Sequence, residues 1–196
     1  MTERIDEFMA LLESRLKPAR FIHSKNVADA AVVLAKQVGA DEEKAYICGL
    51  LHDCMKNAPI EEQKEWMLKL GDPLPSEVLE NPKLWHAPAG AAFVRDELGI
   101  VDGDMISAIK YHTTGRAFMT PLEKVIYVAD FISAERDYPG VERVRARAYE
   151  NIDKAVLDGA QFTLQSLLEK YRKINHDTLA MYNEMAEKLG DQMEEK

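Results

Sequence analysis

The feature that most constrains this chain is the spacing of its apolar residues, which recur every three or four positions in one segment after another. Two runs near the N-terminus illustrate the period: Ile5, Phe8, Met9, Leu12 and Leu16, then Val27, Ala31, Leu34 and Val38. This period is typical of amphipathic helices. No alternating apolar pattern runs long enough to predict a strand. The sequence therefore predicts an all-α protein.

Capping residues predict where several of these helices begin and end. Thr120-Pro121-Leu122-Glu123 combines a capping box with proline at the first helical position. Asp41 is expected to cap a helix that runs to about Lys56, and a later helix is expected to close at Thr114-Gly115. One long helix is expected over residues 141–173.

No internal repeat, low-complexity tract or linker interrupts this pattern, so residues 1–196 are expected to form a single domain, a helical bundle. The net charge of −9 argues against non-specific binding to nucleic acid or to an acidic membrane. The sequence shows neither a signal peptide nor an apolar stretch long enough to span a membrane. We therefore expect a cytoplasmic protein, with Cys48 and Cys54 as reduced core thiols.

Several ionisable residues stand in apolar helical surroundings. His52 shares a predicted helical face with Ala45 and Cys48, so its ring is expected to point inward. Asp53, which follows it, is expected to be buried. A buried carboxylate is costly unless it is paired or binds a metal.

His112 and Asp130 repeat this arrangement, and His23 and His86 lie at predicted helix starts. Each residue alone is compatible with an ordinary core residue whose polar atoms are satisfied. Together they supply four imidazoles and two carboxylates, the mixed ligand set that divalent transition metals accept. The set therefore indicates a metal site.

The order of these residues, His23, then His52-Asp53, then Asp130, resembles that of the HD-domain phosphohydrolases. Longer segments resemble one branch, the bacterial symmetrical diadenosine tetraphosphatases of the YqeK type. The matching segments are RFIHS at 20–24, HDCMK at 52–56, WHAPAG at 85–90, HTTG at 112–115, ADFI at 129–132 with Arg136, and residues 176–183. The resemblance covers nearly the whole chain.

The resemblance implies an HD-domain helical bundle with two divalent transition-metal ions. The implied metal ligands are His23, His52, Asp53, His86, His112 and Asp130. Asp53 would bridge the two ions and is also assigned a catalytic role. Iron is the metal that the branch implies, and the ligand set would also accept manganese.

Four residues are expected to contact substrate. Lys56 follows His52 by one helical turn, so we assign it to a substrate phosphate and to catalysis. Arg136 and Arg20 are further candidates for phosphate binding, although each of these cations could instead be a solvated surface charge. Thr113 could donate a hydrogen bond to phosphate or ribose, or could simply end its helix.

The function expected from the resemblance is hydrolysis of diadenosine tetraphosphate, or related dinucleoside polyphosphates, to two nucleoside diphosphates. A nucleotidase or a guanosine tetraphosphate hydrolase on the same scaffold is an alternative. A sensor that binds a nucleotide without turnover is another, although a pure binder does not need two metals. The partner is expected to be a nucleotide, not nucleic acid or a membrane. A homodimer is one possible assembly.

Overall fold

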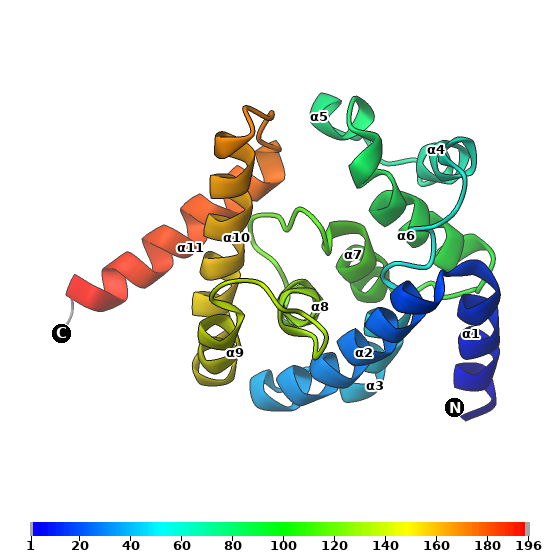
Figure 1. Cartoon of the computed structure of the whole chain (residues 1–196), viewed down its shortest axis with the longest axis horizontal. Helices are drawn as coiled ribbons and strands as arrows, with labels where there is room; N and C mark the ends of the chain where they lie inside the picture. The colour runs from blue at the N-terminus through cyan, green and yellow to red at the C-terminus, as the bar shows by residue number, and fades with distance from the viewer. Residues whose placement is uncertain (1, 195–196) are drawn as a thin grey trace.

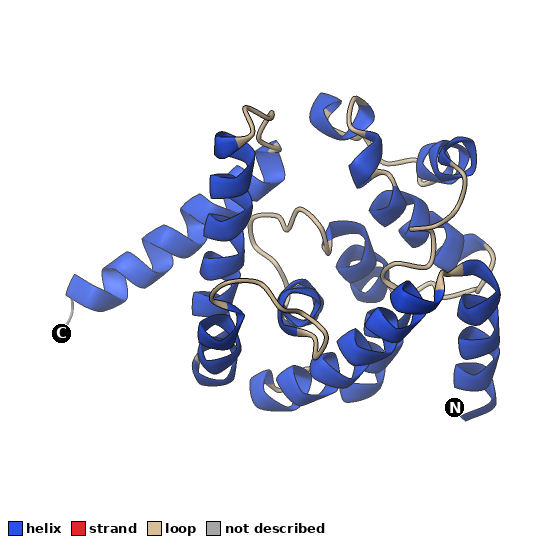
Figure 2. Cartoon of the chain, in the orientation of Figure 1, coloured by secondary structure: helices blue, strands red, loops and turns tan. Residues whose placement is uncertain are grey.

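The computed structural model describes residues 2–194, and all regular structure in that range is helical (Figures 1 and 2). None of these helices combines the length and the apolar character needed to cross a membrane. The elements in chain order are α1 (Thr2–Arg15), α2 (Pro18–Val38), α3 (Glu42–Leu51), α4 (Ile60–Lys69), α5 (Ser76–Leu79), the 3-10 helix η1 (Pro82–Leu84), α6 (His86–Asp96), α7 (Gly103–Tyr111), α8 (Pro121–Ile132), α9 (Val141–Glu150), α10 (Ile152–Glu169) and α11 (His176–Glu194). The predicted all-α class is confirmed.

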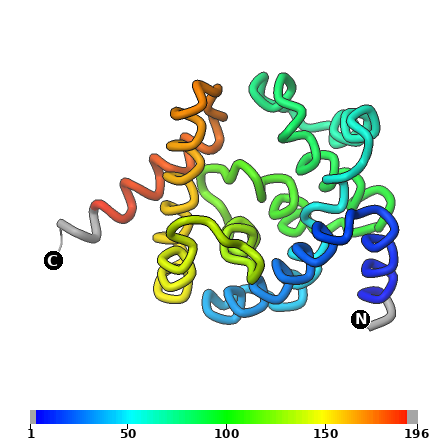
Figure 3. The backbone as a smooth tube through the Cα atoms, in the orientation of Figure 1, coloured from blue at the N-terminus to red at the C-terminus, as the bar shows by residue number. Residues whose placement is uncertain are grey.

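The core forms where α2, α3, α7 and α8 meet. Helix α2 packs against both α3 and α8, and α7 lies between α6 and α8. Helix α10 joins α8 to α11, which is drawn in red at the far side of the molecule from α1 (Figure 3). Chain segments that are distant in sequence are thereby brought around the inner ends of α2, α3, α6, α7 and α8.

A glycine allows α2 and α3 to approach closely. A Cβ atom placed on Gly49 would lie only 2.7 Å from the Cα atom of Ala28. Gly49 lies one turn before His52, and Ala28 lies a little more than one turn after His23. The absent side chain therefore allows the two histidines to meet, with their Nε2 atoms 3.3 Å apart.

Three predicted helices end earlier than the sequence pattern indicates. The helix capped by Asp41 ends at Leu51, not near Lys56, and α7 ends at Tyr111 instead of Thr114-Gly115. The predicted helix over 141–173 is broken at Asn151, whose φ of −159° ends α9. The Asn151 side chain then accepts hydrogen bonds from the backbone of α10 and caps that helix. The capping box at Thr120 and Glu123 is confirmed.

The C-terminal helix is fixed to the loop that follows α7. Gly115 has a positive φ of +62°, and a Cβ atom there would lie 2.0 Å from the Sδ atom of Met181. The Thr178 hydroxyl donates a hydrogen bond of 2.8 Å to the backbone carbonyl of Thr114. The first turns of α11 are therefore in direct contact with the segment that carries His112.

We expect Gly49→Ala to destabilise the protein because the added methyl group meets the backbone of α2. Overpacking of this kind costs about 1–3 kcal/mol, which corresponds to a fall in Tm of roughly 2–10 °C for a chain of this length. Gly103→Ala is the matched control, since nothing lies within 4 Å of a Cβ atom there. Thermal unfolding followed by circular dichroism would measure both variants. Equal Tm values for the two would contradict the close approach.

Candidate metal centre

Five segments bring the predicted ligands together. His23 lies in α2, His86 begins α6, and Asp130 lies near the end of α8. His52 and His112 were expected inside helices, but they are the residues that follow the last helical residues of α3 and α7. Asp53 lies in the turn after α3, where hydrogen bonds join residues three positions apart. The helix ends therefore converge on one point.

The side chains that meet at this point are buried. The four histidines are each at most 4 % exposed, and Asp53 is 2 % exposed. The Asp130 side chain is 20 % exposed and lies at the edge of the group. Burying imidazoles and carboxylates costs free energy unless they have partners, so neighbouring groups must supply hydrogen bonds or opposite charge.

Hydrogen bonds on the Nδ1 side orient three of the four imidazole rings. Nδ1 of His52 lies 2.7 Å from the carbonyl oxygen of Gly49, and Nδ1 of His112 lies 2.8 Å from that of Ile109. Nδ1 of His23 hydrogen-bonds to the carboxylate of Glu135. This is how proteins commonly fix the tautomer and orientation of metal-binding histidines. It leaves each Nε2 atom directed inward.

The two oxygens of Asp53 face different histidines. Oδ2 lies 3.5 Å from Nε2 of His52 and 3.9 Å from Nε2 of His23. Oδ1 lies 3.4 Å from Nε2 of His86 and 3.5 Å from Nε2 of His112. One carboxylate thus stands between two imidazole pairs, as a bridging ligand would.

Two observations indicate that these nitrogen and oxygen atoms could bind metal ions. Oδ1 of Asp53 is buried without a hydrogen-bond partner in the described part of the chain. Two groups of donor atoms also lie within 4.8 Å of one another: His23, His52 and Asp130, and then His52, Asp53 and His112. His86 is outside both groups, but its 3.4 Å separation from Asp53 keeps it beside the second. The residues present therefore suit divalent transition metals.

The electrostatics favour the protonation states that metal ligands need. Burial raises the pKa of Asp53, but His52 and His112 outweigh it and hold that pKa well below its usual value. Asp130 behaves similarly, since burial raises its pKa but His23 and other neighbours lower it strongly. Burial lowers the pKa of His86 well below its usual value. Anionic carboxylates and a neutral imidazole are the forms that bind metals.

The residues expected to bind substrate surround this cluster. Nζ of Lys56 lies 3.0 Å from Nε2 of His86, and burial lowers the pKa of this lysine. Oγ1 of Thr113 lies 3.0 Å from Nε2 of His112 and 3.2 Å from Nε2 of His86. Arg20 and Arg136 are each paired with a carboxylate of the cluster, which the sequence analysis did not predict. Arg20 donates a hydrogen bond of 2.8 Å to Asp53, and Arg136 bonds to both the backbone and the side chain of Asp130.

An open cleft lies next to His23. Lys17, Arg20 and Arg136 line it together with the carboxylates Glu135 and Asp137. Because cations outnumber carboxylates, we call it the cationic cleft. The loop that carries Arg136 is fixed by Arg145 of α9, which donates hydrogen bonds to the carbonyl oxygens of Ile132, Ser133 and Arg136. A polyanion in this cleft would meet guanidinium groups held in place.

Sequence reasoning did not identify Glu135. This carboxylate accepts hydrogen bonds from Asn26 and Ser133 in addition to its bond with His23. Burial raises the pKa of Glu135, but these bonds outweigh it and lower the pKa to about 2. Glu135 and His23 are 112 positions apart and belong to no common motif. The sequence therefore held no signal for their contact.

Comparison with known families confirms the resemblance. Residues 20–135 match the HD domain family. All six candidate ligands and Lys56 fall within this range. The chain belongs to the HD-domain family, and the prediction of an HD-domain hydrolase is confirmed.

Named relatives define the branch within the family. The symmetrical bis(5'-nucleosyl)-tetraphosphatase of Bacillus subtilis (strain 168) is 41 % identical over 179 residues, which are 91 % of this chain and 95 % of the relative. The protein of the same name from Staphylococcus aureus (strain NCTC 8325 / PS 47) is 35 % identical and covers 95 % of this chain and 98 % of its own length. These similarities confirm the predicted branch.

A solved structure has the same fold. It is described as a predicted HD superfamily hydrolase involved in NAD metabolism from Clostridium acetobutylicum, and it is 37 % identical to this chain. The TM-score is 0.90, and the match covers 94 % of this chain and 97 % of the other. The arrangement of helices is therefore shared over almost the full length.

Because each carboxylate oxygen of Asp53 faces its own pair of histidines, we expect about two transition-metal ions per chain. Asp53→Ala should empty both positions, because it removes a ligand from each imidazole pair. Asp29→Ala, an exposed carboxylate on α2, is the matched control and should keep full metal content. Elemental analysis after anaerobic purification would measure all three proteins. Full metal content in Asp53→Ala would show that this residue is not a ligand.

Proposed function

We propose that this protein hydrolyses diadenosine tetraphosphate, or related dinucleoside polyphosphates, symmetrically to two nucleoside diphosphates. The observation that carries the proposal is the similarity over nearly the whole chain to relatives named symmetrical bis(5'-nucleosyl)-tetraphosphatase. The donor cluster around Asp53 supports it, because hydrolysis of a phosphoric anhydride requires strong charge neutralisation at the reacting phosphate.

In this proposal one position is held by His23, His52 and Asp130, and the other by His86 and His112, with Asp53 shared. Divalent ions bound there would act as Lewis acids toward the phosphate oxygens and lower the pKa of water. We propose iron, with manganese as the alternative, because imidazole and carboxylate ligands suit both metals.

The chain's own cations hold the flanking phosphates. Lys56 is placed for this role because its ammonium group lies beside His86 while its side chain is 33 % exposed. Arg136 and Arg20 face the cationic cleft next to His23 and are placed to bind phosphates there. Their planar guanidinium groups can bind phosphate oxygens in pairs. Thr113 is placed to donate a hydroxyl hydrogen bond between the cluster and the nucleotide.

The position of cleavage tests the proposal directly. With metal-loaded protein and diadenosine tetraphosphate in oxygen-18 water, both products should be adenosine diphosphate. One of the two should carry the label on its terminal phosphate, since water attacks a single phosphorus. Chromatography with mass spectrometry would read both results. Formation of adenosine monophosphate and triphosphate would contradict symmetrical cleavage.

The role of Lys56 can be separated from that of the metals. Lys56→Met removes the charge and keeps most of the apolar stem, so metal content should stay unchanged. Loss of a charged transition-state contact should lower kcat/KM by roughly 10- to 1000-fold. Lys36→Met, an exposed lysine at the end of α2, is the control and should retain full activity. Loss of metal in Lys56→Met would instead give this lysine a structural role.

A further inference from the structure

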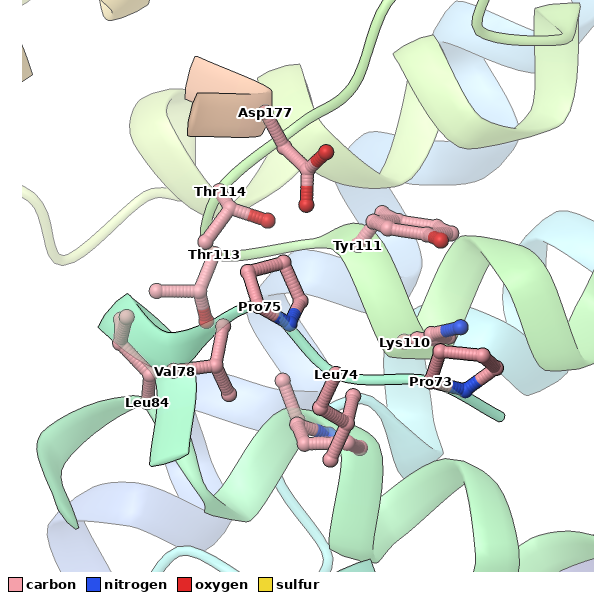
Figure 4. Close-up of a pocket in the computed structure, with 12 residues that line it drawn as sticks. Pro73, Leu74, Pro75, Val78, Leu84, Lys110, Tyr111, Thr113, Thr114 and Asp177 are labelled. Atoms are coloured by element: carbon pink, nitrogen blue, oxygen red, sulfur yellow. The ribbon is translucent and has the colours of Figure 1, made fainter. Parts of the chain in front are cut away.

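A second pocket, separate from the cationic cleft, is shown in Figure 4. One side of its wall is apolar and comes from the segment before α5, from α5 itself and from η1: Leu74, Pro75, Val78 and Leu84. The opposite side carries polar groups, among them Lys110, Thr113 and Thr114, and we call the site the apolar pocket after its first side. About 390 Å³ of space lies between the lining side chains, part of it open to solvent.

The pocket opens next to the candidate ligands. Thr113 lines it and also lies within 3.2 Å of Nε2 of both His86 and His112. Ala87 and Pro88 line it as well, and they directly follow His86 in the chain. A molecule in the pocket would therefore have one end beside this pair of histidines.

The two openings lie at opposite ends of the histidine cluster. The rings form a row in which His23 contacts His52, His52 contacts His112, and His112 contacts His86. The cationic cleft is lined by His23, at one end of the row. The apolar pocket meets the row at the other end, through Thr113. A long substrate could therefore pass along the row with a different environment at each end.

One of the polar side chains that line the apolar pocket is a carboxylate. Asp177, in the first turn of α11, directs its carboxylate into the pocket above Pro75 (Figure 4). The capping role at this helix start belongs to Asn175, whose side chain accepts from the backbone N–H groups of Asp177 and Thr178. Among the side chains of residues 4–190, which the structure describes, none forms a hydrogen bond or ion pair with the Asp177 carboxylate. Burial raises its pKa.

We propose that this pocket binds the base of one nucleoside of the substrate, and that Asp177 accepts a hydrogen bond from an exocyclic amino group of that base. The inference rests on the proposed function and specifies how the protein selects the base of its substrate. The apolar side of the wall, with Leu74, Pro75 and Val78, suits a heteroaromatic ring, while a carboxylate disfavours phosphate. Lys110, the cation at the rim, is already paired with Asp72 at 2.7 Å. A base with an amino group beside Asp177, such as adenine, is therefore preferred over uracil, which presents a carbonyl oxygen there.

Binding of the product nucleotides tests this inference independently of turnover. Calorimetry would compare adenosine 5'-diphosphate with uridine 5'-diphosphate on metal-loaded wild-type protein and on Asp177→Ala. A hydrogen bond to a charged group contributes about 1.5–3 kcal/mol, so the variant should bind the adenosine nucleotide about 10- to 100-fold more weakly. Its affinity for the uridine nucleotide should change by less than about threefold. Asp177→Asn, which keeps an acceptor oxygen, should recover part of the preference.

Two controls make the result specific. Glu187→Gln, an exposed carboxylate on the same helix, should behave like wild type. Leu74→Trp fills the pocket from a loop and should weaken binding of the adenosine nucleotide without changing metal content. Equal affinities of wild type for the two nucleotides, or equal losses for both in Asp177→Ala, would overturn the inference. Absence of hydrolysis with the base preference intact would instead overturn only the proposed function.

Discussion

The negative charge of Asp53, buried where five helices meet, is the constraint on which the rest of this structure depends. A carboxylate removed from water carries a large free-energy cost unless charges and hydrogen-bond donors surround it. Four imidazoles, the Arg20 guanidinium and the Lys56 ammonium lie around it. Because these groups come from α2, α6, α7 and the turn after α3, the packing of the helices and the electrostatics of the site cannot be varied separately.

Much of this arrangement follows from the sequence alone. The apolar period predicts the all-α class and directs His52 and His112 inward, and the capping box predicts the start of α8. The ends of α3 and α7, however, were predicted wrongly. Local propensity extends both helices by several residues, whereas the structure ends each one beside its histidine. A carbonyl oxygen three residues earlier holds the Nδ1 side of each histidine, and its Nε2 side faces groups from other segments. A periodic pattern does not record contacts between segments.

Contacts between residues that are far apart in the sequence could not be predicted from local sequence patterns either. Glu135 lies in a loop without a recognisable pattern, and only the folded chain brings it to His23. Arg20 and Arg136 were identified as cations near the ligands, but their pairing with Asp53 and Asp130 could not be anticipated. Each guanidinium compensates a carboxylate of the cluster and at the same time lines the adjoining cleft.

The contact between α11 and the loop after α7 has a consequence for how such proteins diversify. The region that matches the HD domain ends at residue 135 and contains every candidate metal ligand. Asp177 and the hydrogen bond from Thr178 to Thr114 come from the chain beyond it. The candidate metal ligands and most of the pocket wall thus lie in one stretch of the chain, and the Asp177 carboxylate at the pocket comes from another. If Asp177 selects the base as proposed, exchange of the terminal helix would alter which nucleotides a lineage accepts while every candidate metal ligand stays in place.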